Sequence, residues 1–350
     1  MMEPKTEKKI LQVEDLQVVY ASSEEIVQAV NGVSFSLDYG KTLGLVGETG
    51  AGKTTIAKSI LRILPDPQGK VTRGKILLDD IDLLTIPEED MRKVRGGRIS
   101  MIFQDPMTAL NPIMRVGRQI ADGIQLHQGL SKAEANKRAE EMLEMVGIPA
   151  ERFREYPHQF SGGMKQRVII AMALACNPDL LIADEPTSAL DVTIQAQVMK
   201  LIKDLQRNLN TAVIMITHDF GIIAETCDTV GVVYAGQIVE YGTKEQIFKN
   251  PSHPYTNGLF HALPHINQSV KRLKPVKGMP VDPTALPSGC LFASRCEYAT
   301  EACKTQRVSM TDLGNGHLCR CLRCRGSEPE ASAAQTEQNS SIEHKAAGLP

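Results

Sequence analysis

Apolar and polar positions alternate in two ways along this chain. Short runs of aliphatic and β-branched residues are interleaved with stretches of helical character over about residues 10–241, which is the pattern of an α/β fold. The runs predict strands at residues 42–46, 75–78, 99–103, 180–184, 212–217 and 229–234. Helices are predicted at residues 53–61, 132–146 and 164–175. Ser131 and Glu134 form a capping-box pattern at the start of the second helix, and residues 74–84 and 236–241 predict antiparallel hairpins.

Composition divides the chain into parts. Residues 8–250 contain the α/β alternation, interrupted by a mainly helical stretch at about 105–160, which predicts an inserted helical subdomain. Prolines become frequent from residue 251, so residues 251–325 predict a smaller, loop-rich region. The last part, 326–350, lacks aromatic residues and is rich in Ser, Ala and Glu, so we expect a disordered tail.

The charge and hydropathy of the chain argue against some classes of function. The formal net charge is -2 and the sequence pI is about 6.5, which argues against a nucleic-acid binder. No apolar run approaches the roughly 18 residues that a membrane-spanning helix needs, and the charged first residues lack the apolar stretch of a signal peptide. We therefore expect a cytoplasmic protein whose membrane role, if any, comes through partner subunits.

A glycine-rich motif follows the first predicted strand of the α/β part. It reads Gly47, Glu48, Thr49, Gly50, Ala51, Gly52, Lys53, Thr54 and fits the P-loop pattern between a strand and a helix. Its backbone N–H groups and the helix N-terminus attract phosphate oxygens. We expect Lys53 to reach the β- and γ-phosphates and the Thr54 hydroxyl to bind Mg²⁺.

Two adjacent carboxylates end the apolar strand at 180–184. We expect Asp184 to hold Mg²⁺ and Glu185 to face the attacking water as general base. Alone, such a pair could equally be two solvated acids at the end of a strand. Together with the P-loop, it indicates a nucleotide-hydrolysing site.

A second glycine motif indicates the family. Phe160, Ser161, Gly162, Gly163 and Met164 resemble the signature sequence of ABC ATPases, with Met164 in place of the more usual glutamine. The motif opens a helix that leads directly to the strand at 180–184, as in that family. The resemblance implies that Ser161, Gly162 and Gly163 meet the γ-phosphate bound by a second subunit.

The resemblance extends over about residues 10–250 and implies further site residues. Gln104 is similar to the glutamine that contacts Mg²⁺ or the water, so the implied Mg²⁺ ligands are Thr54, Gln104 and Asp184. His218 matches the switch histidine that contacts the γ-phosphate. Residues 188–191 resemble the D-loop, which contains Asp191, and Tyr20 lies where the family packs an aromatic ring on adenine. Thr55 completes the implied nucleotide-binding set.

Two stretches resemble the oligopeptide, dipeptide and nickel importers within this family. They are residues 104–112, and 253–256 followed by Gly258 and Leu259. A third is the cysteine-rich stretch, in which Cys290, Cys296, Cys303 and Cys321 have the spacing Cys-x5-Cys-x6-Cys-x17-Cys. Some family members bind an iron–sulfur cluster there, so the resemblance implies a [4Fe–4S] cluster.

The metal and its fourth ligand stay open at the level of the sequence. Four thiolates also suit zinc, and reduced, unliganded cysteines are a further alternative. Cys319 or Cys324 could replace Cys321. Cys176 and Cys227 stand in apolar surroundings, so we expect small buried hydrophobes there.

These features predict the ATP-binding and ATP-hydrolysing subunit of an importer of di- and oligopeptides, with nickel or another small solute as the alternative. The resemblance implies a second ATPase subunit, in this family often a non-identical chain, two transmembrane permease subunits and an extracytoplasmic solute-binding protein. It places the chain on the cytoplasmic face of the membrane. A DNA-repair ATPase is disfavoured because only 56 residues separate Gln104 from Ser161, too few for a long coiled coil. A translation-type ATPase would carry two cassettes, and the cysteine region argues against an exporter.

Overall fold

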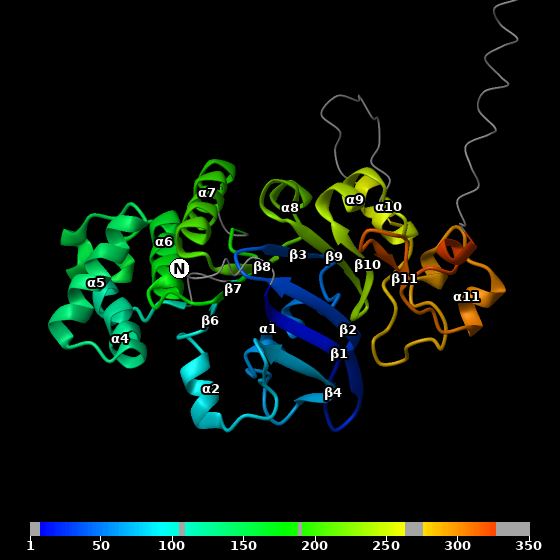
Figure 1. The fold of residues 1–350 in the computed structure, drawn as a ribbon, viewed down its shortest axis with the longest axis horizontal. Coiled ribbons are helices and arrows are strands. Elements are labelled where there is room, and N and C mark those ends of the chain that lie inside the picture. The colour runs from blue at the N-terminus through cyan, green and yellow to red at the C-terminus, as the bar shows by residue number, and fades with distance from the viewer. Residues whose placement is uncertain (1–7, 105–108, 188–190, 263–275, 327–350) are drawn as a thin grey trace, which may run out of the picture.

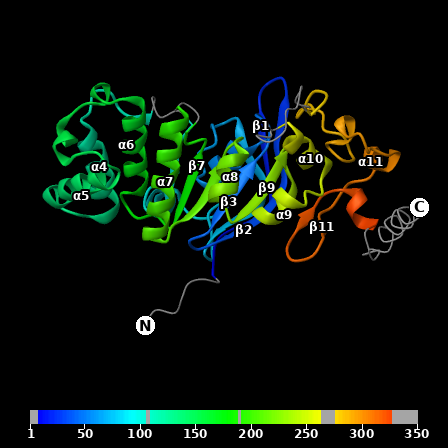
Figure 2. The same ribbon diagram turned by 90° about the horizontal axis from the view of Figure 1, so that it is seen from above.

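The computed structural model describes residues 8–104, 109–187, 191–262 and 276–326. Two β-sheets lie at its centre, one of four strands and one of eight. A helical part lies at one end of the molecule and the cysteine-bearing region at the other, as Figures 1 and 2 show from two directions. The predicted disordered tail lies outside the described residues, apart from Gly326.

The eight-stranded sheet has the order β11-β12-β10-β9-β3-β8-β7-β6. Its parallel strands are β3 (Thr42–Val46), β6 (Ile99–Ile102), β7 (Leu180–Asp184), β8 (Ala212–Ile216) and β9 (Thr229–Tyr234). The antiparallel strands are β10 (Gln237–Thr243), β11 (Thr311–Asp312) and β12 (Leu318–Cys319). Every residue of β3, β7 and β8 is buried, as expected for parallel strands covered on both faces. The predicted strands of this sheet are thereby confirmed.

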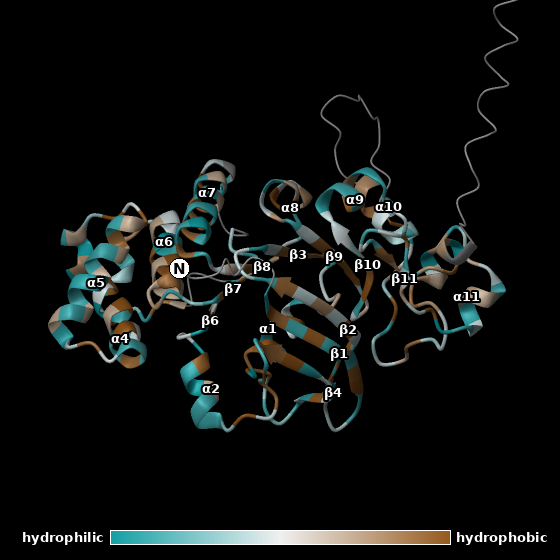
Figure 3. Ribbon diagram, in the orientation of Figure 1, coloured by the Kyte–Doolittle hydropathy of each residue, from teal (hydrophilic) through white to brown (hydrophobic). Residues whose placement is uncertain are grey.

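The four-stranded sheet is antiparallel and has the order β2-β1-β4-β5. It contains β1 (Lys9–Ala21), β2 (Ile26–Asp38), β4 (Gly69–Leu78) and β5 (Ile81–Asp82). Figure 3 shows alternating apolar and polar bands along β1 and β2, which is typical of strands with one buried face. Their apolar face packs with α1 (Lys53–Ile60) in one core cluster.

The inserted helical part consists of α4 (Val116–Gln128), α5 (Lys132–Met145), η1 (Ala150–Arg154) and η2 (Pro157–Gln159), and it packs on α6 (Gly162–Leu174). The capping box of α5 is confirmed, because the Ser131 side chain accepts the Glu134 N–H and Glu134 bonds back to Ser131. Other helices are α2 (Glu88–Val94), α7 (Val192–Leu209), α8 (Phe220–Thr226), α9 (Lys244–Lys249), α10 (Pro254–His261), η3 (Ala293–Arg295), α11 (Glu301–Thr305) and η4 (Leu322–Gly326). None of the described helices is both long and apolar enough to cross a membrane.

Residues 251–262 and 276–326 share the sheet and the core of the α/β part. Strand β12 pairs with β10, and Tyr255, Leu291 and Phe292 belong to the core cluster that contains Val46 and Val232. The cysteine-bearing region therefore packs against β10 and against Tyr234 at the end of β9.

Candidate nucleotide-binding and catalytic site

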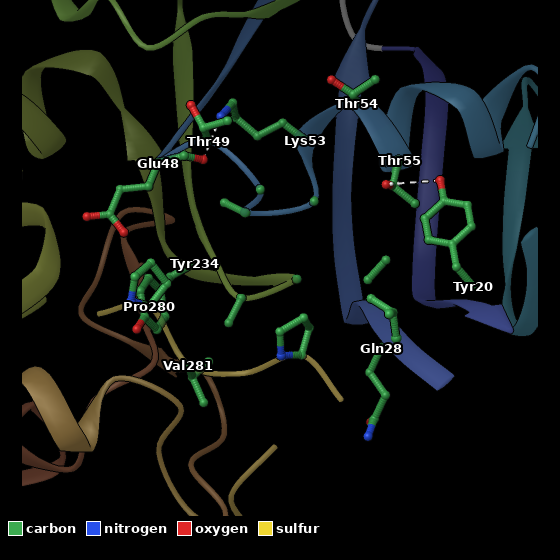
Figure 4. Close-up of a pocket in the computed structure, with 18 of the residues that line it drawn as sticks. Tyr20, Gln28, Glu48, Thr49, Lys53, Thr54, Thr55, Tyr234, Pro280 and Val281 are labelled. Atoms are coloured by element: carbon green, nitrogen blue, oxygen red, sulfur yellow. Dashed lines mark hydrogen bonds between the residues drawn. The ribbon is translucent and has the colours of Figure 1, made fainter. Parts of the chain in front are cut away.

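A cavity of about 440 Å³ opens where β1, β3 and β7 bring the predicted site residues together. The P-loop residues Glu48–Thr55 line it, with Tyr20, Gln104 and Glu185. Residues 27–29 of β2, Tyr234–Gly236 and Pro280, Val281 and Pro283 of the C-terminal region complete the wall. Figure 4 shows Lys53 and Thr49 on one side of this space, with Pro280 and Val281 on another.

The P-loop curls because two of its glycines adopt conformations that other residues avoid. Gly47 has φ 154° and Gly52 has φ 101°. A Cβ at Gly47 would lie 2.1 Å from the Val233 carbonyl oxygen, and one at Gly52 would lie 2.4 Å from that of Ala29. Gly52 is the N-cap of α1, so the uncapped N–H groups of that helix face the loop.

Lys53 lies within the loop rather than in solvent. Its Nζ donates to the carbonyl oxygens of Gly47 (2.8 Å) and Glu48 (3.0 Å). Burial lowers the pKa of this ammonium, while the carboxylates of Glu185, Asp184 and Glu48 oppose that shift. A buried cation beside open N–H groups suits a polyanion such as a triphosphate.

Thr54 and Asp184 are adjacent across the site. The Thr54 hydroxyl donates to the Asp184 carboxylate at 3.2 Å. Burial raises the pKa of Asp184, although the bond from Thr54 and the charge of Lys53 act in the opposite direction. A hydroxyl, a carboxylate and the nearby Gln104 amide are oxygen donors of the kind that Mg²⁺ prefers, so these residues fit that ion.

Glu185 is held by two of the predicted site residues. Gln104 Nε2 donates to Glu185 Oε2 at 2.9 Å, and His218 Nδ1 lies 3.1 Å from Glu185 Oε1. The backbone of Glu185 has φ 48°, a conformation uncommon for a residue with a side chain. Its N–H donates to the Ile216 carbonyl of β8, which fixes the turn after β7.

Tyr20 lines the cavity on the side opposite Glu48 (Figure 4). Its hydroxyl is hydrogen-bonded to the Thr55 hydroxyl at 3.2 Å. The ring is therefore anchored to the first turn of α1, next to the space that a base would enter.

The signature residues do not line this cavity. Ser161 and Gly162 are exposed, and the Ser161 hydroxyl accepts the Met164 N–H at the start of α6. Asp191 is also exposed and caps α7 by accepting the Ile194 N–H at 3.0 Å. The remaining D-loop residues, 188–190, lie outside the described residues. Both motifs therefore present helix N-termini to the surface.

The four predicted cysteine ligands line a second, small cavity of about 20 Å³. They are Cys290, Cys296, Cys303 and Cys321. Among the described residues, however, no group of three or more His, Cys, Asp or Glu side chains is placed to hold a metal ion. Burial raises the pKa of the Cys290 and Cys296 thiols.

The two alternative cysteines occupy a different place. Cys319 is fully buried in β12, does not line the small cavity, and has its sulfur 3.2 Å from that of Cys324. Hydrogen bonding to Cys319 is the main reason that the pKa of the Cys324 thiol rises to about 12. The two cysteines outside the C-terminal region are Cys176, which is partly buried, and Cys227, which is buried.

Sequence reasoning missed one group of residues at the P-loop. Arg295 forms a two-pronged ion pair with the Glu48 carboxylate, at 2.8 and 2.9 Å, and the Tyr255 hydroxyl accepts the Glu48 N–H at 3.0 Å. The resemblance drew attention to the segment around Tyr255, but no local pattern connects it to Glu48.

Two family models match the chain. The ABC transporter model matches residues 30–188, and the model of the oligopeptide/dipeptide transporter C-terminal region matches residues 239–303. The chain is 48% identical to the dipeptide transport ATP-binding protein DppD of Bacillus subtilis over 89% of this chain and 94% of the relative. It is 47% identical to the oligopeptide transport ATP-binding protein OppD of Escherichia coli K12, over 90% and 93%.

A solved structure supports the same assignment. A dimeric post-hydrolysis state of the ATP-binding cassette MJ0796, bound to ADP and Pi, matches with a TM-score of 0.60 and 27% identity over 67% of this chain and 98% of that one. The chain therefore belongs to the ATP-binding proteins of ABC transporters, in the branch with the oligopeptide/dipeptide transporter C-terminal region.

Proposed function

We propose that this chain hydrolyses ATP to drive the import of di- and oligopeptides across the cytoplasmic membrane. The observation that carries the proposal is the Glu185 carboxylate, held between Gln104 and His218 at a P-loop cavity. The names of the relatives, which are dipeptide and oligopeptide transport proteins, support the choice of substrate.

Different side chains of the site have different roles in ATP hydrolysis. The P-loop N–H groups and Lys53 bind and orient the triphosphate, and the Tyr20 ring is available to the base. Glu185 takes the proton of the attacking water, while the contacts from Gln104 and His218 fix its carboxylate. Mg²⁺, when held by Thr54, Gln104 and Asp184, neutralises charge on the phosphates.

Partner subunits complete the ATP site and use the energy of ATP hydrolysis. Ser161, Gly162 and Gly163 lie outside their own cavity, which supports a composite site with a second ATPase subunit, and we favour a related, non-identical chain. Two permease subunits would dock near the helical part, where Ile113 (82%) and Leu126 (78%) are highly exposed apolar side chains. The chain would thus act at the cytoplasmic face of the membrane, and a separate solute-binding protein would deliver the peptide.

Uptake by a deletion strain tests the substrate. We expect loss of growth on di- and tripeptides as an amino-acid source, restored by the wild-type gene but not by Glu185→Gln. The alternative is nickel import. Normal peptide uptake together with lost nickel uptake would overturn the peptide assignment.

We propose further that the cysteine region binds a [4Fe–4S] cluster through Cys290, Cys296, Cys303 and Cys321. Four thiols facing one cavity supply the donors that such a cluster needs. Burial raises the pKa of Cys296, and hydrogen bonding to Cys324 together with burial raises the pKa of Cys321; the nearby Arg323 guanidinium only opposes these two shifts. The cavity has room for about one water molecule, so the cysteine loops must open to admit a cluster, and zinc is the smaller competitor.

Anaerobic purification tests this second proposal. A cluster requires broad visible absorbance and about four irons per chain, and Cys321→Ser should lose both, whereas Cys319→Ser should retain them because Cys319 faces Cys324 instead. Stoichiometric zinc without iron would overturn the proposal. Iron lost from Cys319→Ser but kept in Cys321→Ser would reassign the fourth ligand.

A further inference from the structure

A buried arginine of the cysteine region contacts the P-loop. The Arg295 side chain is only 4% exposed, and its NH1 and NH2 donate to the two carboxylate oxygens of Glu48. Its Nε donates to the carbonyl oxygen of Lys277 (2.9 Å), and NH2 also donates to that of Val276 (3.2 Å). The guanidinium therefore joins three segments: the P-loop, the stretch at 276–277, and its own short helix η3.

A second contact acts on the same P-loop residue. Tyr255 is fully buried, and its hydroxyl accepts the backbone N–H of Glu48 at 3.0 Å. Both the side chain and the backbone of Glu48 are thus fixed by residues outside the P-loop motif. Two independent contacts on one loop residue indicate that the C-terminal region shapes the loop.

The charge of Glu48 makes the contact from Arg295 important for binding. Glu48 lines the nucleotide cavity and has a side chain that is 28% exposed. An unpaired carboxylate here would repel the phosphates of a nucleotide. In Figure 4 the Glu48 side chain points toward Tyr234 and the C-terminal segment and away from Tyr20. The bond with Glu48 is the main reason that the pKa of Arg295 is raised, so the guanidinium keeps its charge.

The C-terminal region also forms part of the cavity wall. Pro280, Val281 and Pro283 line the cavity, and the Pro283 carbonyl accepts the Gln28 N–H of β2 at 2.9 Å. This stretch follows directly on Val276 and Lys277, whose carbonyl oxygens Arg295 bonds. Arg295 is therefore placed to fix the position of the P-loop relative to this part of the cavity wall.

We propose that Arg295 is a positioning residue for ATP binding: it turns the Glu48 carboxylate away from the phosphates, neutralises it, and so makes the nucleotide site depend on the cysteine-bearing region. This inference rests on the proposed ATPase function. It predicts an effect on ATP binding rather than on the chemical step, because Arg295 contacts Glu48 and neither Glu185 nor His218.

The test is ATP hydrolysis as a function of ATP concentration by the purified full-length chain with its partner subunits. We expect Arg295→Met to raise the KM for ATP roughly tenfold, as one uncompensated charge about 10 Å away would at an effective dielectric constant near 20, with kcat within about twofold. Adding Glu48→Gln to Arg295→Met should recover most of the affinity. Higher salt should shrink the defect of the single variant.

Lys304→Met is the matched control, because it breaks an exposed ion pair with Glu301 in the same region and Lys304 has no part in the Arg295 contacts. It should leave the KM for ATP unchanged. A folded Arg295→Met protein with wild-type KM would overturn the proposal, and so would a defect that Glu48→Gln does not relieve, since that would mark a merely structural role.

A second variant covers the case in which Arg295→Met does not fold. Arg295→Lys then replaces it, because one ammonium cannot match both carboxylate oxygens. The KM for ATP should still rise by at least about twofold in this variant, and a wild-type KM would overturn the proposal. A wild-type complex that neither binds nor hydrolyses ATP would instead contradict the proposed function.

Discussion

At the scale of single residues, the geometry around Glu185 sets the proposed proton transfer apart from the proposed nucleotide binding. The carboxylate accepts from Gln104 and lies beside His218, whereas the P-loop and Lys53 surround the phosphate end of the cavity. The left-handed backbone at Glu185 turns its side chain out of β7, while Asp184 stays buried in the strand. A change at Glu185 should therefore affect catalysis without affecting nucleotide affinity.

Glu185→Gln should abolish turnover and retain ATP binding. The amide keeps the size of the side chain but cannot take up the proton of the attacking water, so we expect a loss of at least about 100-fold in kcat. Phosphate release and ATP titration measure the two properties separately. Glu225→Gln, an exposed change in α8, serves as the control. Turnover near the wild-type rate in Glu185→Gln would exclude Glu185 as the general base.

His253 gives the fold a dependence on pH. It is 1% exposed, its Nδ1 accepts the Tyr255 N–H, and burial lowers its pKa to about 3. The unfolded chain takes up this proton below about pH 6.5, but the folded protein does not. The stability contributed by the neutral ring is complete above pH 6.5 and is lost as the pH falls from 6.5 toward 3.

His253→Asn should reduce this dependence, because asparagine can still cap α10 but does not titrate. Urea unfolding at pH 6.5 and 5.5 should show that the wild type loses about 1 kcal/mol more than the variant over this interval. His158→Asn, at an exposed position, should behave as the wild type does. Equal losses in the wild type and in His253→Asn would mean that His253 is protonated in the folded protein.

At the scale of elements, one buried carboxylate on β10 holds two segments of the C-terminal region. Glu240 is fully buried and accepts the N–H groups of Ser252 (2.7 Å) and His253 (3.0 Å). It also lies 2.8 Å from Nε2 of His317, in the segment that leads into β12. The start of α10 and the β12 edge of the sheet thus depend on the same side chain.

Glu240→Ala should destabilise the protein by about 3–5 kcal/mol, since it leaves buried donors without their acceptor. The urea midpoint should fall, and proteolysis should begin beyond residue 250 before the α/β part is cut. Glu245→Ala, at an exposed position of α9, is the control. A midpoint close to the wild-type value would show that water or other groups replace the carboxylate.

The sequence predicts some elements well and others poorly, for physical reasons. Strands β3, β7 and β8 are buried on both faces, so their continuous apolar runs identify them. Strands β1 and β2 were not predicted, because they mix buried and exposed positions over 13 residues each and carry register shifts where they pair. Strands β11 and β12 are two residues long each and depend on pairing with distant residues, because β12 pairs with β10 and β11 pairs with β12.

At the scale of the whole molecule, predictability depends on distance along the chain. The P-loop and the Asp184–Glu185 pair are local patterns that can be read from a few residues. Arg295 and Glu48 are separated by 247 positions, and neither lies in a local sequence pattern that indicates contact with the other. The same limit applies to the cysteines, whose common cavity depends on the path of residues 276–326 around the sheet.

The exposed signature motif leads to a prediction about assembly. Ser161 and Gly162 face solvent at the N-terminus of α6 and contribute nothing to the cavity of their own chain. A helix N-terminus of this kind attracts phosphate, so the motif is available to a nucleotide bound elsewhere. A Cβ at Gly162 would meet nothing within 4 Å, so space next to the motif remains open.

Ser161→Arg should therefore leave ATP binding by the isolated chain unchanged and prevent nucleotide-dependent association. Arginine at this exposed position fills the space that the second subunit's nucleotide would enter, without touching the chain's own P-loop. We expect Glu185→Gln to form a dimer with ATP and Mg²⁺ in size-exclusion chromatography, with the chain itself or with the related ATPase subunit, and the double variant Glu185→Gln, Ser161→Arg to remain monomeric. Ser131→Arg, at an exposed cap of α5 far from the signature motif in sequence, controls for the added charge. If Ser161→Arg instead strongly weakened ATP binding by the monomer, the signature motif would serve its own chain's nucleotide and the composite site would be wrong.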